Sequence, residues 1–244
     1  MKDRVRALVP GPCLNLYRRT RLWLSANRYC GLSPTEVFED VYRRRRWGSS
    51  VEPDHPFCSG SGSKDPVVVD RYVDAMSRWL GQFTAPPSVV DLGCGDFGVG
   101  SRLRPQCVSY TAYDCVAPLI DSNRRRFAHL GVRFEQIDIC TGPTVPADVY
   151  MIRQVLQHLS NERIQAAVTQ CKERCGWLVV TEHLPKRQFK PNVDVATGPF
   201  TRWVVNSGVI LTEPPFNLKV LEQIVLCSTD VPQGVIETVA YRLR

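Results

Sequence analysis

A glycine-rich stretch with an acidic residue just ahead of it is the part of this sequence best suited to binding chemistry. Residues 89–100 read VVDLGCGDFGVG, so Gly93, Gly95 and Gly98 follow a β-branched run that leads into Asp91. Glycines at this spacing allow a tight turn between a strand and a helix, and they let the backbone approach a ligand closely. The stretch therefore predicts a site for a nucleotide-like cofactor.

Three cofactors use turns of this kind, and the surrounding residues separate them. A triphosphate site needs a lysine that reaches the phosphates, whereas this loop carries Asp96 and no lysine. NAD fits the glycine spacing, with Asp114 available for a ribose hydroxyl, but Asp91 lies where a pyrophosphate disfavours negative charge. S-adenosylmethionine (SAM) fits better, because its methionine end carries positive charge that an acidic residue attracts.

The elements that must position these residues follow from the hydrophobic pattern after residue 86. Strands are expected at 88–93, 108–114, 132–139, 147–156 and 176–183, and helices at 97–103, 117–130 and 160–175, the last with Ser160 as its N-cap. Apolar strands alternating with helices predict a mostly parallel sheet covered on both faces. The final strands, 216–230 and 234–244, are joined by the turn VPQG and predict an antiparallel hairpin.

Four motifs, VVDLGCG, YTAYD, FEQIDI and ADVYMIRQVLQHLS, occur in the order and spacing of the class I SAM-dependent methyltransferases, and residues 86–244 resemble that family. The resemblance implies an α/β fold with a Rossmann-like, mostly parallel seven-stranded sheet, helices on both faces and a C-terminal antiparallel hairpin. It also implies S-adenosyl-L-methionine as cofactor and S-adenosyl-L-homocysteine as product. By this likeness the cofactor contacts are Asp91, Gly93 and Gly95 at the methionine moiety, Asp114 at the ribose, Asp138 and Ile139 at the adenine, and Arg153 and Gln154 beneath the cofactor near the acceptor.

The flanking segments are similar to a narrower group, the bacterial methyltransferases of sugars and surface glycans. The shared features are an aromatic helix ending in Trp47-Gly48, the Ser-Gly-x-Gly-Ser loop 59–63, and a Pro-Pro-Phe segment at 214–216. We expect the 59–63 loop to cover the cofactor as a lid, with Trp47 and Ser63 among the cofactor contacts. O-methylation of a sugar, glycan or small-molecule acceptor is therefore the function that the sequence favours.

Methyl transfer to a hydroxyl needs in-line alignment and benefits from a general base. His158, which follows the fourth expected strand, is the first candidate base, and Glu182 and His183 at the end of the fifth strand are the next. A purely structural role for these side chains stays open.

The acceptor is expected to meet an insertion, residues 184–216, between the fifth strand and the hairpin. Its Asn192, Asp194 and Arg202 suit a hydroxyl-rich or anionic substrate, although pairing within the insertion is the alternative. No cluster of carboxylates and histidines has the spacing of metal ligands, so no metal site is predicted.

Residues 1–85 form a basic helical extension with a Gly/Ser loop, expected to serve as a cap or lid. Ser33, Pro34 and Glu36 predict the start of a helix, and the run Arg43–Arg46 adds to a formal net charge of +7. A basic segment of this kind fits peripheral contact with an anionic inner membrane, a nucleic acid, or simple packing on the domain.

Other functions stay open beside the favoured one. An RNA or other nucleic-acid methyltransferase is the main alternative, but no Asn/Asp-Pro-Pro-Tyr segment is present to hold a flipped base. An NAD(P)-dependent oxidoreductase and a non-catalytic SAM-binding scaffold are further alternatives. Ten cysteines without a C-x-x-C pair, and an N-terminus without an apolar signal core, favour a cytoplasmic protein with reduced thiols.

Overall fold

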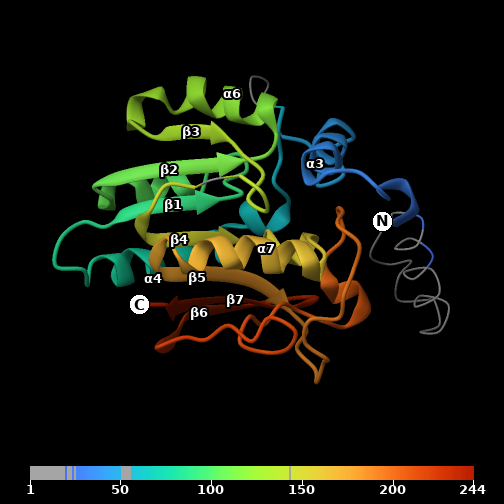
Figure 1. Ribbon diagram of the computed structural model, residues 1–244. Helices are drawn as coiled ribbons and strands as arrows, with labels where there is room; N and C mark the ends of the chain where they lie inside the picture. The colour runs from blue at the N-terminus through green and yellow to red at the C-terminus, as the bar shows by residue number, and fades with distance from the viewer. Residues whose placement is uncertain (1–19, 21–23, 25, 51–55, 143) are drawn as a thin grey trace.

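A seven-stranded sheet with strand order β3-β2-β1-β4-β5-β7-β6 forms the centre of the molecule (Figure 1). The computed structural model describes residues 20, 24, 26–50, 56–142 and 144–244. Its strands are β1 (Ser88–Leu92), β2 (Ser109–Asp114), β3 (Arg133–Gln136), β4 (Ala147–Arg153), β5 (Cys175–Leu184), β6 (Glu222–Val231) and β7 (Gly234–Arg242).

The first five strands are parallel, and β7 pairs antiparallel with both β5 and β6. The alternating pattern and the closing hairpin expected from the sequence are therefore confirmed. Placing β7 between β5 and β6 also distinguishes the sheet from the plain dinucleotide-binding order, in which all strands run the same way.

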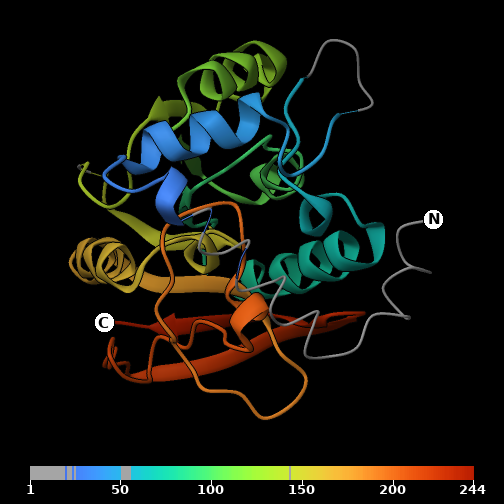
Figure 2. The ribbon, with the colours of Figure 1, turned by 90° about the vertical axis from the view of Figure 1, so that its right-hand side faces the viewer.

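The two faces of the sheet are covered by different helices (Figures 1 and 2). One apolar cluster joins α4 (Pro66–Leu80) and α5 (Gly100–Leu103) to strand residues such as Val89 and Val149, while the other joins α7 (Asn161–Lys172) to Val90 and Tyr150. Neighbouring strand residues alternate between these clusters, as the pleat of a strand requires. The remaining helical elements are α6 (Ala117–Arg126) and the short turns η2 (Arg104–Gln106), η3 (Ala128–Leu130), η4 (Leu156–His158) and η5 (Arg202–Val205).

The N-terminal segment contributes to both the sheet and the site. Helix α4 falls within the extension expected at 1–85, yet Tyr72, Met76 and Trp79 pack into the same core as the sheet. Helix α3 (Pro34–Arg43) starts with the predicted capping box, in which the Ser33 hydroxyl accepts from the Glu36 amide and the Glu36 carboxylate accepts from the Ser33 amide. The short turn η1 (Ser61–Ser63) lies between these two helices in the chain.

Helix α3 lies beyond the carboxyl ends of the parallel strands, where the strand arrows point in Figure 1. Most of the basic segment proposed for membrane contact, residues 1–19, 21–23 and 25, lies outside the described residues. Among the residues that the structure describes, every helix is too short or too polar to span a bilayer.

Candidate active site

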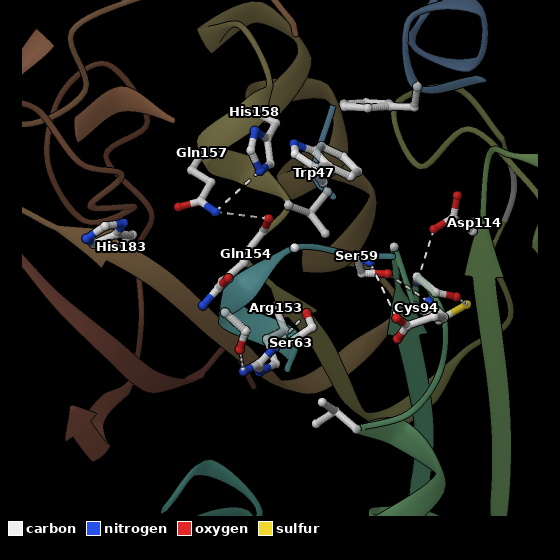
Figure 3. Close-up of a pocket in the computed structure, with 18 of the residues that line it drawn as sticks. Trp47, Ser59, Ser63, Cys94, Asp114, Arg153, Gln154, Gln157, His158 and His183 are labelled. Atoms are coloured by element: carbon white, nitrogen blue, oxygen red, sulfur yellow. Dashed lines mark hydrogen bonds between the residues drawn. The ribbon is translucent and has the colours of Figure 1, made fainter. Parts of the chain in front are cut away.

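A cavity of about 630 Å³ opens at the carboxyl ends of β1, β2 and β4. Because these ends meet at one edge of the sheet, residues far apart in the chain come together there. Figure 3 shows side chains from the glycine loop, the 59–63 loop and the segment after β4 around the same space. The cavity collects every cofactor residue expected from the sequence: Asp91, Gly93, Gly95, Asp114, Asp138, Ile139, Arg153, Gln154, Trp47 and Ser63.

The glycine turn has the backbone shape that the sequence predicts. Gly93 and Gly95 have φ angles of +79° and +55°, in the left-handed region that side chains disfavour. A Cβ at Gly93 would lie 2.4 Å from Cγ2 of Val155, and one at Gly95 would lie 2.5 Å from Oγ of Ser59. The turn therefore needs glycine both for its backbone and for its close approach to neighbouring loops.

A Gly95→Ala variant is expected to separate these two requirements. Gly131 is a matched control, since its φ is +60° and the nearest atom to an added Cβ would be 3.9 Å away. We expect Gly131→Ala to cost about 1 kcal/mol from backbone strain alone, and Gly95→Ala to cost roughly 1–3 kcal/mol more because it displaces Ser59. Urea unfolding measures the loss in the free energy of unfolding for both variants. Equal losses would mean that the 59–63 loop moves to accommodate the added methyl group at no cost.

Two buried carboxyl groups face the cavity from β1 and β2. Asp91 accepts a 3.0 Å hydrogen bond from the Tyr110 hydroxyl, and burial raises its pKa to about 7. Asp114 accepts from the amides of Gly95 and Val116, both at 3.1 Å, and burial raises its pKa to about 6. Carboxylates this deeply desolvated gain most from a ligand that brings positive charge or hydroxyl donors.

The loop after β3 forms the far wall of the cavity. Asp138 accepts a 2.9 Å hydrogen bond from the Cys140 amide, which fixes the loop, and the neighbouring Ile139 is buried in the core. An acidic side chain next to an apolar one can contact the edge and the face of a planar ring. The adenine position expected from the sequence therefore lies in the cavity with suitable chemistry.

The 59–63 loop lies against the glycine turn and is held there from both sides. The Ser59 hydroxyl accepts a 2.9 Å hydrogen bond from the Asp96 amide and lies 3.1 Å from the Tyr42 hydroxyl. Arg153 donates to the Gly62 carbonyl at 2.7 Å and to the Ser63 hydroxyl at 3.2 Å. Arg153 therefore holds the 59–63 loop at the edge of the cavity, and the role of that loop as a lid stays a prediction.

Trp47 and His158 form the wall beside the lid. The Trp47 indole donates to the Pro199 carbonyl at 3.1 Å, and its ring lies 5.0 Å from that of His158. His158 is 9% exposed, and burial lowers its pKa to about 4. Its Nε2 lies 3.4 Å from the amide nitrogen of Gln157, a cavity residue that the sequence analysis did not single out.

The two candidates at the end of β5 fall on opposite sides of the strand. His183 lines the cavity, burial lowers its pKa against the opposing effect of the Gln233 backbone, and its Nε2 atom is buried without a hydrogen-bond partner among the described residues. Glu182 does not line the cavity, so the structure does not place this candidate base at the site. Its carboxyl group is buried, where desolvation raises its pKa to about 8 in spite of the opposing charge of Arg202. Adjacent strand residues point to opposite faces, which explains the difference.

The three residues expected to bind the acceptor instead organise the insertion, and none of them lines the cavity. The amide nitrogen of Asn192 donates to three backbone carbonyls of residues 210–214, and its oxygen accepts from the Ile210 amide. Ser160 occupies the N-cap position of α7 as predicted, but its side chain makes no capping bond; Asp194 instead accepts from the Asn161 backbone amide at 2.7 Å.

Arg202 is the clearest of these corrections. It is 0% exposed, and its guanidinium donates to the Val193 carbonyl and, at 2.6 Å, to the Leu159 carbonyl. These bonds attach the insertion to the segment that carries His158. The insertion therefore supports the wall of the cavity, and Asn192, Asp194 and Arg202 bond to backbone groups instead of facing it.

Several cavity residues were missed by the sequence analysis. Tyr42, Ser59 and Gln157 line the cavity, and Tyr110 holds Asp91 from the neighbouring strand. Only Ser59 carried a signal, since it belongs to the Gly/Ser loop. No group of three or more metal-ligating side chains occurs among the residues described by the structure.

The donor set of the cavity fits SAM. Asp91 is a buried carboxyl group whose one side-chain partner is a neutral hydroxyl, which suits the ammonium group of the methionine moiety. The positive-φ glycines leave the backbone open to a close ligand, and Asp114 and Asp138 follow at the end of β2 and just after β3. A pyrophosphate would place negative charge against the same carboxyl groups.

Comparisons with known proteins agree with this geometry. Residues 89–175 match a family described as the methyltransferase domain. An uncharacterized methyltransferase of Mycobacterium tuberculosis is 32% identical over 77 residues, which are 31% of this chain and 39% of that protein. An uncharacterized methyltransferase of Mycobacterium bovis matches to the same extent. The chain thus spans about two fifths of the length of the curated relatives it matches.

Solved structures share the fold. N-methyltransferase NodS from Bradyrhizobium japonicum, in complex with S-adenosyl-L-homocysteine, superposes with a TM-score of 0.59 at 15% identity over 84% of this chain and 98% of that chain. Magnesium protoporphyrin IX methyltransferase from Synechocystis, with bound SAM, has a TM-score of 0.57 at 15% identity over 87% and 99%. Residues 89–175 therefore match the methyltransferase-domain family, and the chain shares the fold of these SAM-dependent methyltransferase structures.

Proposed function

We propose that this chain is a SAM-dependent methyltransferase that acts on a hydroxyl group of a sugar, glycan or small-molecule acceptor. The observation that carries the proposal is the buried Asp91 carboxyl group facing a cavity that is also lined by Asp114, at the end of β2, and by Asp138, just after β3. This order of groups matches the ammonium, ribose and adenine of SAM in turn. When bound, SAM supplies a methyl group activated by its sulfonium.

The task of the protein is to align the acceptor with that group and to exclude water. The 59–63 loop closes one side of the cavity through Ser59 and through the bonds from Arg153 to Gly62 and Ser63. Trp47, fixed by its bond to Pro199, closes another. Alignment of reacting groups in such an enclosure lowers the barrier of an in-line displacement by several kcal/mol.

A hydroxyl acceptor loses its proton during the transfer, and His183 is the better placed of the two imidazoles to receive it. The pKa of His158 falls to about 4, which makes it a weak base, and its ring is packed against Trp47. His183 lines the cavity at the end of β5, and its Nε2, like Nδ1 of His158, is buried without a hydrogen-bond partner among the described residues. Because burial lowers its pKa, the ring is neutral at neutral pH and able to accept a proton.

Replacing His183 with glutamine is expected to lower kcat by about 10²-fold or more while leaving SAM affinity within about twofold. In the unchanged enzyme, kcat should fall as the pH drops below the ordinary histidine range, because protonation removes the base. That acidic limb should disappear in His183→Gln. The opposite result would assign the proton to His158. In that case His158→Gln would lose as much activity, and His183→Gln would keep the fall in kcat at low pH.

The proposed function is tested by calorimetric titration with SAM, S-adenosylhomocysteine and NAD, followed by transfer of a labelled methyl group to an acceptor panel. We expect binding of SAM and S-adenosylhomocysteine and none of NAD. The labelled product should be a methyl ether, stable to mild base and distinct from a methylamine. Binding of NAD without SAM would refute the cofactor, and label found only on nitrogen or nucleic acid would refute the acceptor class.

A further inference from the structure

A second cavity, of about 750 Å³, lies next to the first. It is formed by the start of the insertion, by η5 and by the β6–β7 turn. The two cavities share Pro232 and Gln233, so they are neighbours across that turn. The proposed cofactor and the proposed base both belong to the first cavity and leave the second without an assigned ligand.

A stacked pair of rings links the two cavities. His183 lines the first and Trp203 the second, and their rings are parallel to within 9° with centroids 6.4 Å apart. Gly234 fixes the His183 ring from the turn, since an added Cβ would lie 2.9 Å from Nε2 and 2.1 Å from the Leu184 carbonyl oxygen. The proposed base is therefore held between the cofactor cavity and the second cavity.

The second cavity carries positive charge beside an aromatic ring. Lys186 and Arg187 both line it, and both are exposed. Lys186 pairs with Asp230 at 2.9 Å, but the two side chains are 51% and 81% exposed, so an incoming anion competes with a weak partner. Arg187 forms no ion pair with any residue that the structure describes. Arginine and lysine next to tryptophan suit an anionic group attached to a ring.

We propose that this second cavity is the acceptor subsite and that it selects acceptors bearing a phosphate or carboxylate group. Lys186 and Arg187 hold the anion, Trp203 packs against the adjoining ring or chain, and the target hydroxyl passes Gln233 to reach His183. The inference rests on the proposed function, because it assigns the first cavity to SAM. It gives the insertion a role in recognition through residues 186, 187 and 203, in place of Asn192, Asp194 and Arg202.

The test uses calorimetry on the full chain saturated with S-adenosylhomocysteine, so that probes cannot enter the cofactor cavity. Phenyl phosphate, benzoate and benzyl alcohol are the probes, and the first two distinguish a phosphate from a carboxylate preference. We expect at least one anionic probe to bind more tightly than benzyl alcohol by about tenfold or more. We expect Lys186→Gln/Arg187→Gln to abolish that preference.

The control is Arg125→Gln/Lys172→Gln, which removes the same charge from exposed positions on α6 and α7. It should leave the preference intact. Trp203→Leu should weaken phenyl phosphate binding while leaving the weaker binding of inorganic phosphate unchanged. An anion preference equal in both double variants, or no anion binding to the saturated chain, overturns the subsite. Failure of S-adenosylhomocysteine itself to bind would instead overturn the proposed function.

Discussion

Replacing Asp91 with asparagine is expected to weaken SAM binding by about 10²- to 10⁴-fold. The asparagine keeps the shape of the side chain but removes the negative charge that the methionine ammonium would meet in a buried site. Removing one partner of a buried ion pair costs about 3–5 kcal/mol, which corresponds to this loss of affinity. Calorimetric titration with SAM measures it directly.

The pH dependence of binding gives the same prediction a second test. The pKa of Asp91 is raised to about 7 by burial, so the carboxyl group of the cofactor-free chain is largely protonated below that pH. SAM binding to the carboxylate form must release this proton. The dissociation constant should therefore rise as the pH falls from 7 to 5, by up to about tenfold per pH unit, and Asp91→Asn should flatten this dependence.

Stability of the same variant separates a binding effect from misfolding. A carboxyl group with a higher pKa in the folded than in the unfolded chain favours folding less as the pH rises. The loss of stability occurs between the unfolded pKa and the folded pKa. For Asp91 that interval runs from 3.8 to about 7. The cofactor-free Asp91→Asn chain should thus be at least as stable as the parent at pH 8. Asp74→Asn, at an exposed position on α4, should change neither property; equal SAM affinity in both variants would remove Asp91 from the binding site.

Replacing Arg202 with methionine is expected to destabilise the folded chain by about 3–5 kcal/mol. Methionine fills part of the volume, but the Val193 and Leu159 carbonyls then lose their donors inside the protein. Each buried polar group left without a partner costs about 1–3 kcal/mol, and loss of packing adds to this. Thermal unfolding should show a decrease in Tm of about 10 °C.

Glu182→Gln is the matched control for this prediction. The pKa of Glu182 is raised to about 8, so its side chain is mostly neutral at pH 7 and a neutral amide is a close replacement. We expect a change within about 1 kcal/mol. A Tm for Arg202→Met close to that of the parent chain would mean that water or the backbone replaces the lost donors.

The cofactor side of the site could be predicted because it depends on a periodic fold. Once Asp91, Asp114 and the motif containing Asp138 are read as the ends of consecutive parallel strands, the geometry of the sheet brings them to one edge. The glycines at 93 and 95 add a backbone requirement that their positive φ angles in the structure meet. No knowledge of side-chain packing was needed for these residues.

The acceptor side could not be predicted in the same way. Asn192, Asp194 and Arg202 lie in a segment without periodicity, and polar side chains there serve a ligand or the backbone equally well. Their partners are carbonyl and amide groups distant in sequence, such as the Leu159 carbonyl and the Asn161 amide. At the end of β5, Glu182 and His183 are adjacent and therefore point to opposite faces of the strand, so only one of them can face the cavity. The sequence does not show which one does.

The cap that Asp194 places on α7 limits how this protein can change its acceptor. Through the bonds from the Asn161 backbone amide to Asp194 and from the Ser160 backbone amide to Thr197, the insertion supplies the cap of a helix that packs on the sheet. An exchange of residues 185–216 for another insertion would leave the first turn of α7 uncapped. New acceptor specificities should therefore arise by substitution within the insertion, or by exchange of a unit that also includes residues 156–161.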